Sequence, residues 1–418
     1  LERSTSANRI GTETIQTFRM PFLRCDMAGN RENPMMVHRL LLMCIVCSSS
    51  WPADCLLHRA TEDLSLKTDE ADYCLGALEA AELNQRRWQV VMERPFDFWF
   101  QNQWNEDGHY SVVANWLREI RNGSQRTCKG AHILHTEMVS GEAASLVDQR
   151  KNQLVTLSYL ATQSPASVLN IWTGDAEEFA SPPTWLAALL AHEEYGTRLR
   201  LRLFNSTDDV SKLPLSSDEV SAIQEALTGV EYEASRSDIQ RYTVLYTNGG
   251  TWFDTDIIFL SDVEPILGMD FVTVTQENFL NNAVVGTASE GSTFMLETLK
   301  KSARLFQADP TSTNYFRYGP DLFEDVRNTS RQMPFRVMPG CLVDSSWVGA
   351  WTGSPSWEGF FAEEATQENL DFLESRTGPF CFHWHGHWEE DIVVGSPAEV
   401  AHASFVRKLG LDPSSFGI

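Results

Sequence analysis

The sequence of 418 residues is short of basic side chains, because 33 Lys and Arg face 57 Asp and Glu, giving a formal net charge of −24. A surface of that sign repels phosphate backbones and anionic lipid headgroups. The composition therefore argues against a protein that binds nucleic acid or a membrane surface through bulk charge. The hydrophobic share of 42% is nevertheless enough for a sizeable core, which excludes a disordered chain or a small disulfide-stapled protein.

Long apolar runs are also missing. The run Leu40–Cys47 is too short for a membrane span, which needs about 20 apolar residues. A basic segment precedes this run and a serine triplet follows it, so residues 36–50 have the outline of a signal peptide or short signal anchor. Residues 1–35 would then be an upstream extension, and any membrane association would go through the amino-terminal segment. The alternative is that the run is a buried strand or the start of a helix. We expect a protein of the Golgi or secretory-pathway lumen, or a secreted one.

Cysteine is scarce as well, with 8 residues. The one C-x-x-C pair, Cys44 to Cys47, lies in the same apolar run, so the sequence offers no zinc knuckle elsewhere. Five cysteines follow the serine triplet, and this odd number leaves at least one thiol free or paired between chains. Sequons for N-glycosylation at Asn122, Asn205 and Asn328 agree with a lumenal protein, although chance alone would produce about as many.

Strand and helix patterns alternate from residue 131 to residue 395, after a mixed region, 51–130, that we interpret as a stem or amino-terminal elaboration. In Arg198–Leu203, leucines occupy one face and arginines the other, which predicts a half-buried strand with a solvated arginine row. We expect residues 396–418 to be a C-terminal tail. The predicted helices are Leu146–Gln163, Asp218–Leu227 and Ala234–Tyr246, and the other predicted strands are His132–Leu134, Val168–Trp172, Thr251–Leu260 and Phe271–Thr275.

This alternation predicts an α/β domain with a mostly parallel central sheet. The segment Ser237–Asp256 carries the most informative chemistry in it. Asp238 and Arg241 are three residues apart, so on a helix they share one face and can reach one ligand together. The helix is expected to end at Asn248-Gly249-Gly250, where glycine permits positive φ and a close backbone approach.

Asp254 and Asp256 follow at i and i+2, nominally on the same side of the next strand. Two carboxylates so placed can grip a divalent cation, and hard oxygen ligands suit Mn²⁺ or Mg²⁺ with room left for a diphosphate. Each piece alone is unspecific, since a bare D-x-D is mostly a solvated turn and S-D-x-x-R is a helix salt bridge. An EF-hand is excluded, because Phe259 occupies the position of the required glycine.

The joint pattern SDxxRYxxLYxxGGxWxDxD is far more specific. It resembles the signature of the DxD-containing glycosyltransferases, in particular a family 32-like group of α1,4-galactosyl- and α1,4-N-acetylglucosaminyltransferases and initiation-type mannosyltransferases. Four further segments resemble parts of this group: His135-Thr-Glu137, Asn281-Asn-Ala-Val-Val285, Tyr318-Gly-Pro-Asp-Leu322 and Phe382-His-Trp-His-Gly-His-Trp388. The similarity covers about residues 130–390, and it implies a GT-A type, Rossmann-like nucleotide-sugar-binding domain.

The resemblance implies a role for each matching residue. Asp256 looks like the direct metal ligand, and Asp254 like the carboxylate that contacts donor ribose or sugar and reaches the metal through water. Asp238 and Arg241 look like the pair that holds the donor sugar hydroxyls, which makes Asp238, Arg241 and Asp254 the catalytic candidates. A histidine of the terminal box, His383 or His385, looks like a companion for the metal or diphosphate.

Three more positions come from the departures from the family pattern. Asn282 stands where the family has a small glycine and Asp321 where it has glutamine, so Asn281, Asn282 and Asp321 are candidates for the acceptor side. Gly250 and Trp252 complete the candidate donor site, with Trp252 either packing under the nucleotide or stacking on it.

Together these features predict a metal-dependent retaining glycosyltransferase that uses Mn²⁺ or Mg²⁺ and a nucleotide-diphosphate sugar. It would transfer a hexose or N-acetylhexosamine to a hydroxyl of a glycan or glycolipid. Two alternatives stay open at this point: a nucleotide-sugar-binding protein with weak or no turnover, and a glycoside hydrolase with paired carboxylates.

Overall fold

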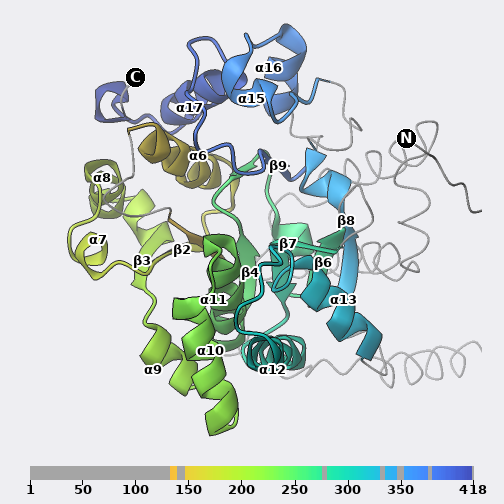
Figure 1. The fold of residues 1–418 in the computed structure, drawn as a ribbon. Coiled ribbons are helices and arrows are strands. Elements are labelled where there is room, and N and C mark those ends of the chain that lie inside the picture. The colour runs from red at the N-terminus through yellow and green to blue at the C-terminus, as the bar shows by residue number, and fades with distance from the viewer. Residues whose placement is uncertain are drawn as a thin grey trace, which may run out of the picture. The chain divides into compact units, whose positions relative to one another are not determined.

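The computed structural model describes residues 132–138, 146–274, 280–329, 335–345, 353–374 and 379–416 (Figure 1). The expected upstream extension, signal segment and stem, residues 1–130, lie outside these described residues. Within the described ranges, no helix has the length and apolar character that crossing a membrane requires.

A seven-stranded sheet forms the centre of the described part of the chain, in the order β3-β2-β1-β4-β7-β6-β8. Strand β7 is antiparallel to both of its neighbours, whereas every other neighbouring pair is parallel. The predicted α/β class with a mostly parallel sheet is therefore confirmed. The strands are β1 (Ile133–Glu137), β2 (Val168–Thr173), β3 (Leu199–Leu203), β4 (Gly250–Phe253), β6 (Phe271–Val274), β7 (Leu280–Thr287) and β8 (Arg336–Pro339).

Helices cover both faces of this sheet. Consecutive residues of a strand point to opposite faces, so each strand contributes side chains to both layers of the core. Trp252 and Val285 pack into one apolar cluster, while their neighbours Phe253 and Val284 pack into the other. On the Trp252 side lie α9 (Ser206–Ser211), α10 (Ser217–Gly229), α11 (Glu233–Asn248), α12 (Thr293–Ala308) and α13 (Pro320–Thr329). On the Phe253 side lie α6 (Leu146–Thr162), α8 (Thr184–Ala191), α15 (Gly359–Ala362), α16 (Gln367–Glu374) and α17 (Pro397–Lys408), and the short α7 (Ala176–Ala180) follows β2.

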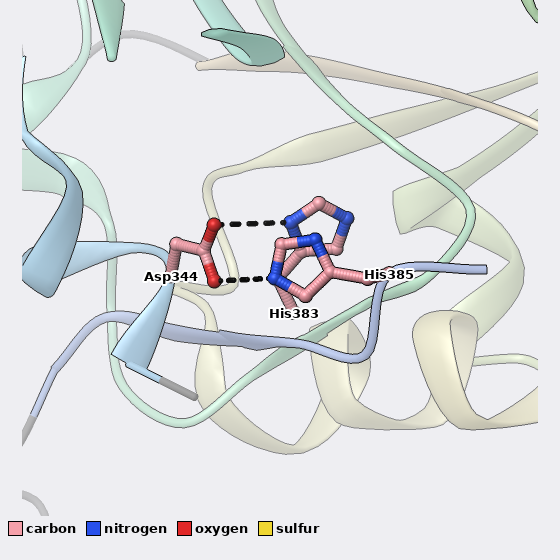
Figure 2. A group of neighbouring side chains, drawn as sticks. All are labelled: Asp344, His383 and His385. Carbon is pink, nitrogen blue, oxygen red and sulfur yellow. Dashed lines mark hydrogen bonds and ion pairs between the residues drawn. The ribbon is translucent and has the colours of Figure 1, made fainter. Parts of the chain in front are cut away.

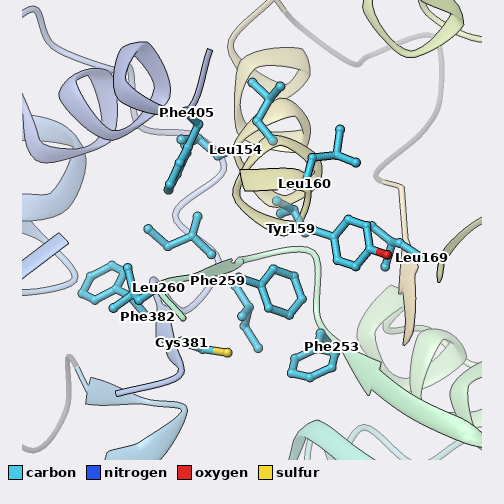
Figure 3. Close-up of a cluster of buried hydrophobic side chains, with 14 of the residues drawn as sticks. Leu154, Tyr159, Leu160, Leu169, Phe253, Phe259, Leu260, Cys381, Phe382 and Phe405 are labelled. Carbon is cyan, nitrogen blue, oxygen red and sulfur yellow. The ribbon is translucent and has the colours of Figure 1, made fainter. Parts of the chain in front are cut away.

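The expected C-terminal tail, residues 396–418, instead contains helix α17, which is part of this core. Helix α17 packs against α6, and its Phe405 is 2% exposed. Figure 3 shows Phe405 in the same cluster as Tyr159 of α6 and Phe259. The apolar residues of α17 lie on one face of a helix, and burying that face requires a partner, which α6 provides.

The expected strand Thr251–Leu260 is in fact two strands in different sheets. Strand β4 ends at Phe253, a turn follows, and β5 (Ile257–Phe259) pairs antiparallel with β9 (Cys381–His383), with Ile257 opposite His383. The prediction of one strand was wrong because the apolar, β-branched composition continues across the turn. The two aspartates thus lie in the connection between the two sheets.

Of the predicted arginine row on β3, Arg200 and Arg202 are exposed, whereas Arg198 is buried. Its guanidinium donates to the carbonyl oxygens of Leu160 and Gln163, both at 3.0 Å. Arg198 therefore satisfies carbonyl groups at the end of α6 that have no partner within the helix.

The turn between α11 and β4 lies against the first strand of the sheet. Gly249 and Gly250 both have positive φ, 63° and 87°. His135 Nε2 donates to the Gly249 carbonyl at 2.9 Å, and its Nδ1 accepts from Trp172 Nε1 at 3.0 Å, which sets the neutral tautomer. Burial lowers the pKa of His135 to about 4, so the ring stays neutral. A Cβ on Gly250 would lie 2.4 Å from the Ile133 carbonyl oxygen.

We predict that Gly250→Ala destabilises the fold by about 3 kcal/mol or more, because positive φ and a backbone clash act together. Gly268→Ala is the matched control, since Gly268 has φ 77° but no heavy atom within 4 Å of the point that a Cβ would occupy, so it should cost only about 1–2 kcal/mol. Urea unfolding of both variants measures the difference. Equal losses would contradict the close packing of this turn against β1.

Candidate donor and metal site

The first half of the site is a buried arginine held between two carboxylates. Arg241 on α11 is 3% exposed, and its Nη2 lies 2.5 Å from Asp254 Oδ1. Its Nη1 lies 3.5 Å from Asp238 Oδ1, one turn earlier on the same helix. The predicted i, i+3 face is therefore present, and it points at the residue that follows β4.

Strand β7 completes this half of the site. Arg241 Nη1 donates to the Asn282 carbonyl oxygen, and Asn282 Nδ2 donates to Asp238 Oδ1 at 2.5 Å. Asn282 Nδ2 also lies 3.0 Å from the hydroxyl of Tyr242. Asn282 was expected on the acceptor side, and it contacts Asp238 and Arg241, the pair expected to hold the donor sugar.

Trp252 packs beneath this group. Its ring is fully buried, its Nε1 donates to Asp254 Oδ1 at 2.9 Å, and Arg241 Cζ lies 5.4 Å from the ring centroid. Burial raises the pKa of Asp254 to about 7, although Arg241 acts in the opposite direction. Burial likewise raises the pKa of Asp238 against the charge of Arg241. The site thus holds two carboxylates near one fixed positive charge.

The second half of the site is built around Asp256. The pairing of β5 with β9 places His383 Nε2 3.1 Å from Asp256 Oδ2. The same oxygen accepts the Gly386 N–H at 2.6 Å, and the Asp256 carbonyl accepts the Trp384 N–H at 3.0 Å. The terminal histidine box is therefore attached to the second aspartate of the D-x-D by backbone and side chain.

Asp344 is the residue that sequence reasoning missed. It follows the short helical turn Gly340–Leu342, and Figure 2 shows its carboxylate facing the rings of His383 and His385. Its Oδ1 lies 2.9 Å from His385 Nε2, and its Oδ2 lies 3.5 Å from His383 Nδ1. No local sequence pattern around Asp344 indicates this contact, because its partners are about 40 residues away.

Acidic and basic side chains alternate along the contacts from Asp256 through His383 and Asp344 to His385. Burial alone would lower the pKa of His383, but the carboxylates of Asp256 and Asp344 on its two ring nitrogens raise it well above its usual value. Burial alone would raise the pKa of Asp256 and of Asp344, yet the neighbouring histidines hold both below their usual range. Burial and the charge of His383 lower the pKa of His385.

The loop that carries the histidines has an unusual backbone. His385, Gly386 and His387 all have positive φ, at 55°, 83° and 49°. Residues other than glycine rarely adopt positive φ, so contacts with the rest of the protein must hold the loop in place. Lys151 on α6, which is fully buried, provides two of them by donating to the His387 carbonyl and, at 3.0 Å, to the Trp388 carbonyl.

The residues present fit a divalent cation. Asp256 Oδ1 is a buried acceptor with no hydrogen-bond partner among the described residues, and a cation would satisfy it. Ligand atoms of Asp344, His383 and His385 lie within 4.8 Å of one another. The carboxylate oxygens suit Mn²⁺ or Mg²⁺, and the imidazole nitrogens are ligands of other first-row divalent metals.

Three of the predicted site residues remain: Gly250, Asn281 and Asp321. Gly250 packs against β1 as described above, and the Asn281 side chain accepts from the Ala283 N–H at 2.6 Å within its own strand. Asp321 is exposed in the first turn of α13, where it accepts from Asn314 Nδ2 at 2.7 Å. Of the acceptor candidates, Asp321 alone is open to solvent.

Residues 151–272 match the family model described as the glycosyltransferase sugar-binding region containing the DXD motif. The match extends from α6 to β6 and includes Asp238, Arg241, Asp254 and Asp256. It supports a relation to the broad family of DXD glycosyltransferases and, with it, a transferase enzyme. The α/β fold with a mostly parallel central sheet is the one that the sequence predicted, and the GT-A type stays a prediction.

No curated protein matches the chain. Among solved structures, the glycosyltransferase PaToxG is 16% identical, with 52% of this chain and 78% of that chain covered and a TM-score of 0.36. Mouse xyloside xylosyltransferase 1 is 12% identical over 63% of this chain and 100% of that chain, with a TM-score of 0.37. The glycosyltransferase GlyE of Streptococcus pneumoniae TIGR4 is 11% identical, with 69% of this chain and 62% of that chain covered and a TM-score of 0.33. Because these scores are low, the site roles rest on the contacts above.

We predict that Asp344→Asn weakens Mn²⁺ binding about 10- to 100-fold, because the carboxylate orients both histidines and sets their charge. Calorimetric titration with Mn²⁺ measures the effect. Asp371→Asn, the same change on the exposed face of α16, should leave the affinity at the wild-type value. Wild-type affinity in the Asp344 variant would show that the cation does not depend on this cluster.

Proposed function

We propose that the protein is a metal-dependent, retaining glycosyltransferase that transfers a hexose or N-acetylhexosamine from a nucleotide-diphosphate sugar to a hydroxyl of a glycan or glycolipid. One observation carries the proposal above all. Arg241 links Asp238 to Asp254, and two residues later Asp256 has a buried Oδ1 that finds no hydrogen-bond partner in the described part of the chain. We extend the proposal to the family 32-like group and to the secretory-pathway lumen, on the sequence features alone.

Asp256 would hold the cation, together with His383 or His385 and with Asp254. When bound, Mn²⁺ or Mg²⁺ supplies positive charge that offsets the negative charge developing on the departing diphosphate. This matters in a chain of net charge −24, which otherwise repels a diphosphate.

Asp238 and Arg241 would bind hydroxyls of the donor sugar and fix the direction in which its anomeric carbon faces. Their network supports this role, since Asn282 and Asp254 hold both side chains in one arrangement before any ligand arrives. A preorganised polar group of this kind avoids reorganisation during the reaction.

The transfer requires no external base. The acceptor hydroxyl oxygen bonds to the anomeric carbon while the bond from that carbon to the diphosphate oxygen breaks. The hydroxyl proton leaves on the nucleoside diphosphate, which departs from the same face. Retention of configuration then gives an α-linked product from an α-linked donor.

The decisive experiment is donor hydrolysis by the purified protein. We predict Mn²⁺-dependent release of nucleoside diphosphate from one of UDP-Gal, UDP-GlcNAc, UDP-Glc or GDP-Man. Asp256→Asn should lower that rate about 100-fold or more, because the cation loses its ligand, while the variant stays folded by circular dichroism. Removal of metal with EDTA should have the same effect on the wild-type protein, and added Mn²⁺ should restore it.

Asp371→Asn is again the control, because it makes the same change of charge at an exposed position away from the site. Hydrolysis that persists with EDTA and in the Asp256 variant would contradict the metal assignment. Donor binding without any hydrolysis or transfer would instead identify a nucleotide-sugar-binding protein.

A further inference from the structure

Two neighbouring aromatic side chains are exposed on the loop between α12 and α13. Tyr315 is 52% exposed and Phe316 is 56% exposed, and their rings meet edge to face with centroids 5.3 Å apart. In the described ranges, Phe179 at 42% is the other aromatic residue with a comparable exposure. Open aromatic surface of this kind marks a binding site more often than isolated exposed leucines do.

The loop that presents these rings is tightly held. Arg317 donates through Nη1 to the Asp309 carbonyl at 2.5 Å and through Nη2 to the Leu305 carbonyl, at the end of α12. The Tyr318 carbonyl accepts from the hydroxyl of Tyr242 on α11 at 2.6 Å. The rings therefore sit on a fixed support that is bonded to the helix of the donor site.

The same loop reaches the donor residues directly. A Cβ on Gly319 would lie 3.1 Å from Asp238 Oδ2 and 3.1 Å from Asn282 Oδ1, so the backbone passes beside this pair. The Phe316 carbonyl accepts the Gly319 N–H at 3.2 Å, which links the aromatic residue to that close approach.

Tyr315 itself lies beside the start of α11. Its ring centroid lies 5.6 Å from that of Tyr232, the residue that precedes α11. The pKa of Tyr315 is raised, first by burial of part of the ring and then by the charges of Asp238, Asp254 and Asp256. The loop thus presents Tyr315 beside the start of the helix that carries Asp238 and Arg241.

We propose that Tyr315 and Phe316 form a platform that binds a pyranose ring of a neutral saccharide acceptor, next to the bound donor. This inference rests on the proposed function and adds the substrate class of its second site. A pyranose ring has an apolar C–H face that packs on an aromatic ring and a polar edge of hydroxyls that can turn towards the donor.

The negative charge beside Tyr315 and Phe316 favours a neutral sugar over an anionic acceptor. The Asp238 carboxylate lies beside Gly319 of the same loop. Asp321, whose N–H donates to the Phe316 carbonyl at 3.1 Å, adds an exposed carboxylate. A phosphorylated or acidic acceptor would be repelled here, whereas sugar hydroxyls can donate to these oxygens. The prediction that Asp321 lies on the acceptor side agrees with this placement.

The test separates acceptor binding from donor chemistry. The probes are methyl β-lactoside, methyl β-chitobioside and methyl α-mannoside, with a Ser/Thr peptide and dodecyl alcohol as acceptors of other classes. Transfer is measured with the donor that the hydrolysis screen identifies. We expect transfer to at least one methyl glycoside, with its KM raised about 10-fold in Tyr315→Ala and in Phe316→Ala through loss of ring stacking. Donor hydrolysis without acceptor should keep its wild-type rate in both variants.

Two controls make the result specific. Tyr315→Phe keeps the ring and should restore the wild-type KM, and Phe179→Ala removes an exposed aromatic side chain elsewhere and should change neither measurement. Unchanged KM in both platform variants, or transfer to the peptide or alcohol but to no glycoside, would overturn the platform while leaving the donor site intact. Absence of both donor hydrolysis and transfer in the wild-type protein would overturn the proposed function and the platform with it.

Discussion

The pairing of β5 with β9 is the interaction on which the rest of the site depends. It joins a segment near residue 257 to one near residue 383 and sets Ile257 opposite His383. That register places His383 against Asp256 and lets the backbone of Trp384 and Gly386 bind the same aspartate. A shift by one residue would turn His383 to the other face and leave Asp256 without this support.

Arg241 offsets the mutual repulsion of the buried carboxylates Asp238 and Asp254. It contacts Asp238 and Asp254 at once, and the His383 ring lies between the carboxylates of Asp256 and Asp344 in the same way. Among the described residues, Asp256 Oδ1 is left as a buried acceptor for a cation. The local balance explains how an acidic protein can prepare a site for a diphosphate and its cation.

The sequence predicted the parts of this site that are close together along the chain. Asp238 and Arg241 share a helix face because helical periodicity determines it, and the two glycines end that helix as expected. The role of Asp344 and the anchoring of the histidine loop by Lys151 could not be predicted, because each depends on a contact between distant segments. The break of the strand after Phe253 was missed for a different reason: composition does not record which sheet a strand joins.

The central claim is that Asp256 Oδ1 is a ligand of a divalent cation. Anomalous scattering from crystals grown with Mn²⁺ and a nucleoside diphosphate tests it most directly. The account predicts a manganese peak at about 2.2 Å from Asp256 Oδ1, a typical distance for such ligands, with His383 or His385 turned towards it. A peak elsewhere, or bound nucleotide with no manganese beside Asp256, would contradict the account.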